Sequence, residues 1–350
     1  MTPRAGVQKK FRLALVGAGR FAHLYHVPAL VSDPRAELVM ICDPTPSSVT
    51  TRLARSTGAA LAADITAAID GDACDAVVIS TPHALHAGQV RAALAARKHV
   101  LVDKPFVLRS AEARDLAGTA AARGLIGRVA FQRRLDPAYR SARRIIEDGR
   151  LGRLRMVEST QLGGEWVIVA DGNLPRDTGP SRPAWYVDPA VAGGGVLFGR
   201  GAHVADVVPW LVGRAPIRVR SWVVPSPAGP LDLGGVVDVD FGGLLWRAAT
   251  LADRAPLTDE VRLIGERGRV EIRKPEGTLR SFTVVHEDPE YERLSVIRSR
   301  RRAIPAVVDF LDALEGRPSL GCTLEDAVIS VRILEAAYAS SAADGCWVDF

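Results

Sequence analysis

Apolar and polar positions divide the first 130 residues into short apolar runs separated by longer mixed stretches. In the mixed stretches, apolar residues recur at helical spacing, most clearly before Leu30 and between Leu85 and Arg97. The apolar runs have the length of strands buried on both faces, and they span residues 11–16, 37–42, 76–80 and 99–102. Strands that alternate with helices predict an α/β fold with a doubly wound parallel sheet.

The pattern changes in the second half of the chain, where short apolar runs follow one another without long helices between them. These runs are punctuated by Gly and Pro, and they span residues 218–224, 236–241, 244–251, 261–264, 269–272 and 281–285. Such spacing predicts a mostly antiparallel sheet. We therefore expect two domains, residues 1–127 and 128–350. Residues 163–183 are rich in Gly, Pro and Asp, which predicts a long loop that could cover a substrate.

Composition and charge exclude several classes of protein. The chain is 47% hydrophobic and 24% charged, as in ordinary globular proteins. It has no run of 18 apolar residues, and residues 1–10 lack the apolar stretch of a signal peptide, so we expect a cytoplasmic protein without a membrane anchor. The net charge is +5, but the basic residues are spread along the chain, and the run at residues 298–302 has no aromatic neighbours. We therefore expect no nucleic-acid partner.

Cysteine and histidine positions give no sign of a metal site. The four cysteines are far apart, which is typical of reduced core residues. Two H-x-x-H pairs, His23/His26 and His83/His86, have no third ligand at a suitable spacing. We therefore expect no bound metal.

A glycine-rich turn follows the first predicted strand. Residues 17–22 fit G-x-G-x-x-A, a turn in which the first glycine permits the bend, the second lets a pyrophosphate approach, and the small sixth residue lets a helix pack closely. The candidate cofactor contacts in this turn are Gly17, Gly19, Arg20, Phe21 and Ala22.

Asp43 ends the second predicted strand, 21 residues after Ala22. A carboxylate at this place can bind the adenosine ribose hydroxyls of a dinucleotide and would repel a 2′-phosphate, so NAD is favoured over NADP. NADP is left open by four nearby polar side chains, Thr45, Ser47, Ser48 and Arg52. Asp43 could also serve only as a turn or cap residue.

Further motifs resemble the Gfo/Idh/MocA family of oxidoreductases, the group of glucose–fructose oxidoreductase and inositol dehydrogenase. Residues 80–86 resemble its T-P-x-x-x-H segment, and residues 98–105 resemble K-H-V-x-x-E-K-P with Asp103 in place of Glu. Residues 192–197 resemble A-G-G-G-x-L, and residues 201–206 resemble G-x-H-x-x-D. The resemblance covers nearly the whole chain.

The resemblance implies an N-terminal Rossmann domain and a C-terminal α/β domain with a large open sheet, through which family members commonly form oligomers. We therefore expect a homo-oligomer, a dimer or a tetramer. The resemblance also implies an NAD(P)-dependent enzyme that moves a hydride to or from a carbonyl or secondary alcohol of a sugar, nucleotide sugar or cyclitol. It adds candidate cofactor contacts at Ser80, Thr81, Pro82, His86, Asp103 and Lys104.

By the same resemblance, Lys104 and His203 handle the substrate oxygen and its proton. The family motif before the histidine is D-x-G-x-H, whereas this chain has Gly199 in place of the aspartate. Tyr186 is our candidate second acid, and the other candidate replacements are Glu165, Asp188 and Arg200.

Asp206 lies three residues after His203, on the same helical face, where it could orient the histidine or make a structural hydrogen bond. The missing aspartate leaves two other functions open. One is an imine or C=C reductase that acts on a non-sugar substrate, and the other is a non-catalytic dinucleotide-binding sensor.

Overall fold

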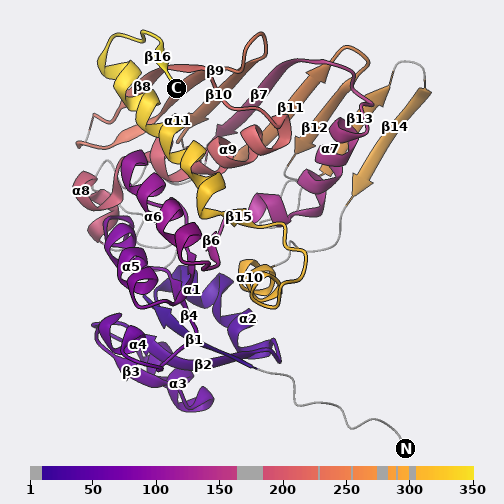
Figure 1. Ribbon diagram of the computed structural model, residues 1–350. Coiled ribbons are helices and arrows are strands. Elements are labelled where there is room, and N and C mark those ends of the chain that lie inside the picture. The colour runs from indigo at the N-terminus through magenta and orange to yellow at the C-terminus, as the bar shows by residue number, and fades with distance from the viewer. Residues whose placement is uncertain are drawn as a thin grey trace, which may run out of the picture.

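Two sheets organise the chain in the computed structural model (Figure 1). The structure describes residues 10–163, 184–227, 229–253, 255–273, 283–288, 291–298 and 305–350. The part of the predicted lid at residues 164–183 and the side chains of the arginine run at residues 298–302 lie outside the described part of the chain. None of the helices in the described ranges is long and apolar enough to cross a membrane.

The first sheet is a doubly wound parallel sheet, which confirms the predicted fold class. Its strand order is β15-β6-β5-β4-β1-β2-β3, and only the β15–β6 pairing is antiparallel. The order reverses between β1 and β4, and ligands of such sheets bind beyond the carboxyl ends of the strands at this point. The strands are β1 (Phe11–Val16), β2 (Ala36–Cys42), β3 (Ala60–Ala62), β4 (Ala76–Ile79), β5 (His99–Val102), β6 (Gly127–Val129) and β15 (Cys322–Thr323).

Helices cover both faces of this sheet. Alternate residues of β1 enter two different apolar clusters, Leu13 and Leu15 on one face and Ala14 and Val16 on the other. This division follows from the two-residue period of a strand and explains why the run is apolar throughout. The helices are α1 (Arg20–Tyr25), α2 (Val27–Ser32), α3 (Ser48–Thr57), α4 (Thr66–Ile69), α5 (His83–Ala95) and α6 (Ser110–Ala122).

The second sheet has the order β14-β13-β12-β11-β7-β10-β9-β8-β16. All its pairings are antiparallel except that of β7 with β10. The sequence did not predict β7, although this strand lies in the middle of the sheet. The strands are β7 (Leu154–Leu162), β8 (Arg218–Pro225), β9 (Asp232–Asp240), β10 (Leu245–Leu251), β11 (Thr258–Gly265), β12 (Arg269–Arg273), β13 (Thr283–Asp288), β14 (Tyr291–Arg298) and β16 (Val348–Asp349).

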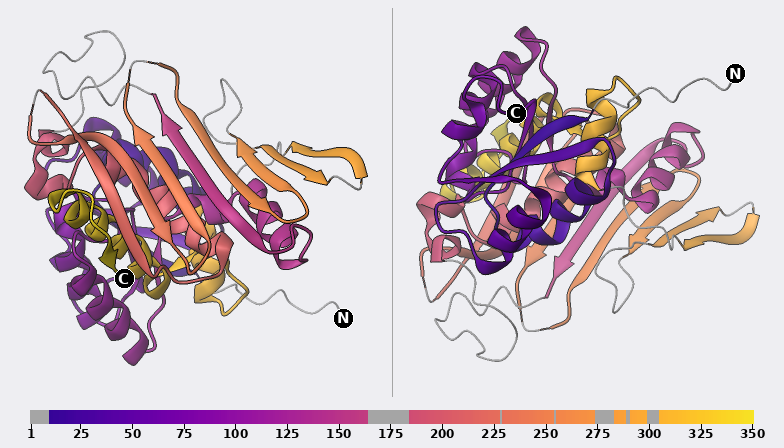
Figure 2. Two further views of the ribbon diagram at one scale, coloured as in Figure 1. Left: turned by 90° about the horizontal axis from the view of Figure 1, so that it is seen from above. Right: turned by 90° about the horizontal axis from the view of Figure 1, so that it is seen from below.

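Three helices pack on one face of the second sheet, and they are α7 (Pro137–Glu147), α9 (Val196–Val212) and α11 (Leu324–Ala342). The short helix α8 (Pro189–Ala192) packs against α5. One apolar cluster contains residues of both sheets and of α9 and α11, so the two halves share a continuous core. Figure 2 shows the opposite face of the sheet, which no described helix covers.

The chain returns to the first sheet near its C-terminal end. Helix α10 (Ala306–Leu314) packs into an apolar cluster of the first sheet, and the Arg35 guanidinium bonds Asp312 at 2.7 Å. Strand β6 crosses the expected boundary between residues 127 and 128, and β15 pairs with it. The division into two domains therefore stays a proposal. Because α10 and β15 lie with the first sheet, no single boundary in the sequence separates the residues of the two sheets.

Candidate active site

The glycine turn after β1 lies at the carboxyl end of the first sheet. Gly17 has φ +84°, and a Cβ added there would lie 2.6 Å from the main-chain oxygen of Ser80. Only glycine fits this approach of the turn to the end of β4. A Cβ on Gly19 would meet none of the described atoms within 4 Å, whereas Ala22 is fully buried. The turn therefore offers an open backbone beside a closely packed helix, which fits a pyrophosphate group.

Asp43 supports this turn. Its carboxylate accepts hydrogen bonds from the main-chain N–H groups of Ala18 at 3.0 Å and Thr45 at 2.9 Å. Each carboxylate oxygen can accept a further hydrogen bond, so Asp43 can hold ribose hydroxyls while it fixes the turn. The structure thus gives Asp43 a turn role and leaves its cofactor role a prediction.

Asp103 and Lys104 follow β5 at the same edge of the sheet. The Asp103 carboxylate is buried, 2.7 Å from Nε2 of His26, and accepts a hydrogen bond of 2.5 Å from Oγ of Ser80. Burial acts to raise the pKa of Asp103, but the charge and hydrogen bond of His26 and the hydrogen bond of Ser80 lower it below the usual value. Asp103 is therefore a charged carboxylate at neutral pH.

Lys104 reaches the helix that carries His203. Its Nζ donates a hydrogen bond of 3.2 Å to the main-chain oxygen of Gly199, which lies on α9 one turn before His203. Residues four apart lie on one face of a helix, so Lys104 contacts the face that presents His203. The structure thus places the Lys104 ammonium against α9 one turn before His203, and these are the two residues that the family motifs predicted for catalysis. Their catalytic roles stay a prediction.

The triple glycine before α9 lets the helix begin against its neighbours. The carboxylate of Asp232, on β9, accepts hydrogen bonds from the N–H groups of Gly195 at 2.7 Å and Leu197 at 2.8 Å. The Tyr338 hydroxyl donates to the same carboxylate at 2.6 Å. A Cβ on Gly195 would lie 2.2 Å from the Asp232 main-chain oxygen. Asp232 thus positions α9, and no local motif pointed to it because it lies 37 residues from Gly195 in the sequence.

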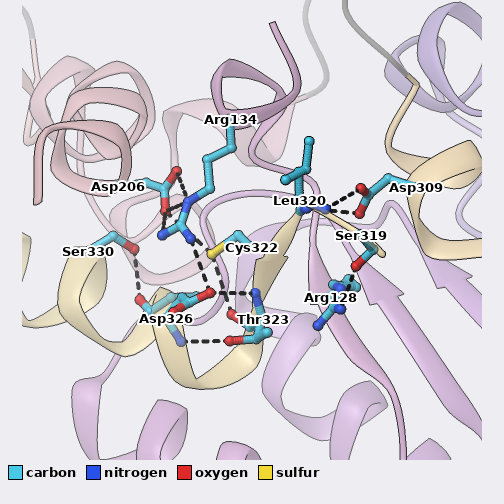
Figure 3. A network of polar contacts seen from close by, with 12 residues as sticks. Arg128, Arg134, Asp206, Asp309, Ser319, Leu320, Cys322, Thr323, Asp326 and Ser330 are labelled. Atoms are coloured by element: carbon cyan, nitrogen blue, oxygen red, sulfur yellow. Dashed lines mark hydrogen bonds and ion pairs between the residues drawn. The ribbon is translucent and has the colours of Figure 1, made fainter. Parts of the chain in front are cut away.

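A buried ion pair at Asp206 also fixes this helix (Figure 3). The Arg134 guanidinium lies 2.6 Å from Asp206 and 3.0 Å from Asp326. The Cys322 thiol donates to Asp206 at 3.3 Å. Asp206 and Arg134 are 2% and 5% exposed. Of the two interpretations of Asp206, the structure supports the structural hydrogen bond.

Tyr186 lies in an aromatic cluster beside the end of β4. Its ring stacks on Trp185 at 4.0 Å between centroids, and the ring of His83 lies 4.9 Å from Trp185 and 6.1 Å from Tyr186. Burial, together with the nearby His86 and Lys104, lowers the pKa of His83 to about 3. The His83 ring is therefore neutral, and the cluster lies close to Lys104. Tyr186 stays a candidate acid because it belongs to this cluster.

Other candidate site residues have structural roles. His86 is fully buried, and its two ring nitrogens lie 2.9 Å and 3.0 Å from the carbonyl oxygens of Pro105 and Thr81. The ring thus lies between the turns after β4 and β5, and the cofactor contact of His86 stays a prediction. Asp188 caps α8, Arg200 donates to the Gly163 carbonyl at 2.7 Å, and Glu165 lies outside the described residues.

The remaining candidate contacts surround the open end of the glycine turn. Arg20 is exposed, and Phe21 is half-buried and stacks on Tyr25. Thr81 and Pro82 are half-buried at the start of α5. No described group of three or more His, Cys, Asp or Glu side chains could hold a metal ion.

Replacing His83 with glutamine should make the protein more tolerant of mild acid. The folded protein holds this imidazole neutral, whereas the unfolded chain binds a proton near pH 6.5, so stability is lost as the pH falls below 6.5. Between pH 7 and pH 5 we expect His83→Gln to lose about 2 kcal/mol less unfolding free energy than the wild type. Urea unfolding at both pH values measures this, with His23→Gln as a half-buried control. Equal losses in His83→Gln and wild type would contradict it.

The strand order and the glycine turn define a dinucleotide-binding protein with a Rossmann domain. Residues 11–131 match the family model described as "Oxidoreductase family, NAD-binding Rossmann fold", and residues 139–271 match the "GFO/IDH/MocA C-terminal domain". The chain therefore belongs to the Gfo/Idh/MocA family, which confirms the resemblance read from its motifs.

Similar proteins include several dehydrogenases. Levoglucosan dehydrogenase of Pseudarthrobacter phenanthrenivorans is 31% identical over 48% of this chain and 40% of that protein. The rhizopine catabolism protein MocA of Rhizobium meliloti is 27% identical over 94% of both chains. The crystal structure of GenD2 from gentamicin A biosynthesis, in complex with NAD, is 28% identical with a TM-score of 0.80, and covers 100% of this chain and 99% of its own. This chain matches about half or less of the length of levoglucosan dehydrogenase and the next curated relatives.

Proposed function

We propose that this protein is an NAD(P)-dependent oxidoreductase that transfers a hydride between nicotinamide and a carbonyl or secondary alcohol. The substrate class that we propose is a sugar, a nucleotide sugar or a cyclitol. The observation that carries the proposal is the contact of Lys104 with α9 one turn before His203, at the carboxyl ends of β4 and β5. Related proteins named for levoglucosan and scyllo-inositol support the substrate class.

The residues at the first sheet fit the cofactor. The open backbone of Gly19 would face the pyrophosphate, Asp43 the adenosine ribose, and Asp103 the nicotinamide ribose. When bound, the nicotinamide supplies or accepts the hydride. We propose NAD as the preferred form because the Asp43 carboxylate would repel a 2′-phosphate.

The substrate oxygen lies between the two catalytic candidates in this proposal. The Lys104 ammonium binds the oxygen and stabilises the negative charge that develops on it. His203 holds or releases the proton, a task that imidazole can perform near neutral pH. The helix has no carboxylate at Gly199, so we propose the Tyr186 hydroxyl as a second proton donor.

The open face of the second sheet supports a further proposal, that copies of the chain associate there as a dimer or tetramer. Arginine and acidic side chains alternate across this face; for example, Arg220 and Arg247 both bond Asp238. We also propose that the protein acts in the cytoplasm on a small molecule.

A substrate screen tests the proposed function. Purified protein is incubated with NAD(H) or NADP(H) and levoglucosan, inositols or nucleotide sugars, and absorbance at the nicotinamide band is followed. We expect multiple turnovers with at least one sugar or cyclitol. Turnover only with cyclic imines or activated C=C bonds would favour the alternative reductase, and cofactor binding without any turnover would favour a sensor.

Replacing Asp43 with asparagine should change the choice of cofactor. Asparagine keeps an acceptor oxygen for the Ala18 N–H group but removes the charge that would repel a 2′-phosphate. We expect the ratio of NADPH to NADH affinity to rise about 10-fold in Asp43→Asn. Titration of protein fluorescence with each cofactor measures it, and Asp64→Asn, on an exposed turn after β3, is the control. An unchanged ratio would argue against this role of Asp43.

A further inference from the structure

The first H-x-x-H pair contains two histidines with very different surroundings. His23 is half-buried, and its Nε2 lies 3.1 Å from Oγ1 of Thr50. His26 is 1% exposed, and its Nε2 lies 2.7 Å from Oδ1 of Asp103. Nδ1 of His26 is buried and has no hydrogen-bond partner within the described ranges. A buried imidazole whose main polar contact is a single carboxylate calls for an explanation beyond packing.

The surroundings of Asp103 show what this contact does. A charged carboxylate can only accept, so Nε2 of His26 carries the proton and donates to Oδ1, while Ser80 donates to Oδ2. The two donors come from the junction of α1 with α2 and from the end of β4. They hold the carboxylate from two sides, at the residue that directly precedes Lys104.

His26 is itself held by the glycine-rich turn. Its ring makes an edge contact with Phe21 at 5.8 Å between centroids, and Phe21 stacks on Tyr25 at 4.4 Å. A chain of contacts therefore runs from Phe21 in the turn, through His26, to Asp103. It joins the segments that follow β1, β4 and β5 at the cofactor end of the sheet.

We infer that His26 is a positioning residue that keeps the Asp103 carboxylate charged and oriented toward the nicotinamide ribose of the cofactor, beside Lys104. The inference rests on the proposed function. The groups around Asp103 are His26 from the α1–α2 junction, Ser80 directly after β4, His83 and His86 from α5, and Lys104 next in the chain. His86 lies against main-chain carbonyls, so His26 and Ser80 are the two donors that stabilise the charged carboxylate.

NADH itself is the probe for the experiment. The dissociation constant of NADH is measured by fluorescence between pH 5 and pH 8 for wild type, His26→Leu, His26→Gln and His23→Leu. We expect His26→Leu to weaken NADH binding about 10- to 100-fold, and to weaken it more as the pH falls, because the pKa of Asp103 rises without its donor. Glutamine retains a donor at the ε position, so His26→Gln should stay within about 5-fold of wild type.

Two further measurements separate positioning from a structural role. Thermal unfolding at each pH shows whether each variant is folded, and Asp103→Asn alone and combined with His26→Leu gives a double-mutant cycle. We expect the double variant to bind NADH no more weakly than Asp103→Asn. Additive losses, or a loss in His26→Leu that is the same at every pH, would overturn the inference. If wild type binds neither NADH nor NADPH, the proposed function fails first, and the inference fails with it.

Discussion

Replacing Lys104 with methionine will reduce kcat/KM about 1,000-fold and leave the fold in place. Methionine has a similar length but cannot stabilise negative charge on the substrate oxygen, and losses of about 100- to 1,000-fold are usual for one such group. The side chain is half-buried and bonds the Gly199 carbonyl, so its removal should change stability little. Steady-state kinetics with the best substrate of the screen measures the loss. The kcat/KM of His203→Asn should fall about 100- to 10,000-fold, because asparagine cannot donate the proton.

Lys98 provides a matched control, because Lys98 and Lys104 flank the same strand, β5. Lys98 lies before the strand, at the opposite edge of the sheet, and its Nζ donates to the Gly71 carbonyl at 2.7 Å. Lys98→Met should therefore lower stability and leave kcat/KM near the wild-type value. More than a tenth of wild-type activity in Lys104→Met would contradict the proposed role of Lys104.

Breaking the Arg134–Asp206 pair will cost about 3–5 kcal/mol of unfolding free energy. Both side chains are almost completely buried, so either substitution Arg134→Met or Asp206→Asn disrupts a charge-paired network inside the core. The double variant Arg134→Met/Asp206→Leu should be more stable than Arg134→Met, because it removes both charges. Urea unfolding followed by circular dichroism gives these values.

Arg91→Met is the control for this network. Its partner Asp115 lies at 3.2 Å, and both side chains are more than half exposed. Solvent screens such a pair, so we expect a change below about 1 kcal/mol. An equally small change in Arg134→Met would show that the buried pair does not hold α9 in place.

The sequence predicted the parts of the site that depend on local conformation. The bounds of β1 and β5 were predicted to the residue, because apolar runs between turn residues report strands directly. Gly17 followed from the requirement for a left-handed backbone at a tight turn. Lys104 and His203 came from motif positions that are 99 residues apart, and the fold places the Lys104 ammonium against the helix that carries His203.

Contacts between distant segments could not be predicted. His26 and Asp103 are 77 residues apart, and Arg134 and Asp206 are 72 residues apart. A polar residue at a buried position carries no sign of its partner in the sequence around it. The contacts of the His86 ring could not be predicted for the same reason, since a motif places the residue near the site but does not say which way the ring points. Strand β7 was missed because its mixed polar sequence becomes half-buried only beside β10 and β11.

The sequence by itself determined the two-sheet architecture, the glycine turn and the family. The periodicity of a strand, the conformation of a glycine and the residues of a motif are all properties of short segments. The tertiary structure decided which polar side chains face the cofactor and which hold the scaffold. It assigned Asp206 to Arg134, His86 to two carbonyl groups and Asp103 to His26, since buried polar groups must find partners wherever the packed chain supplies them.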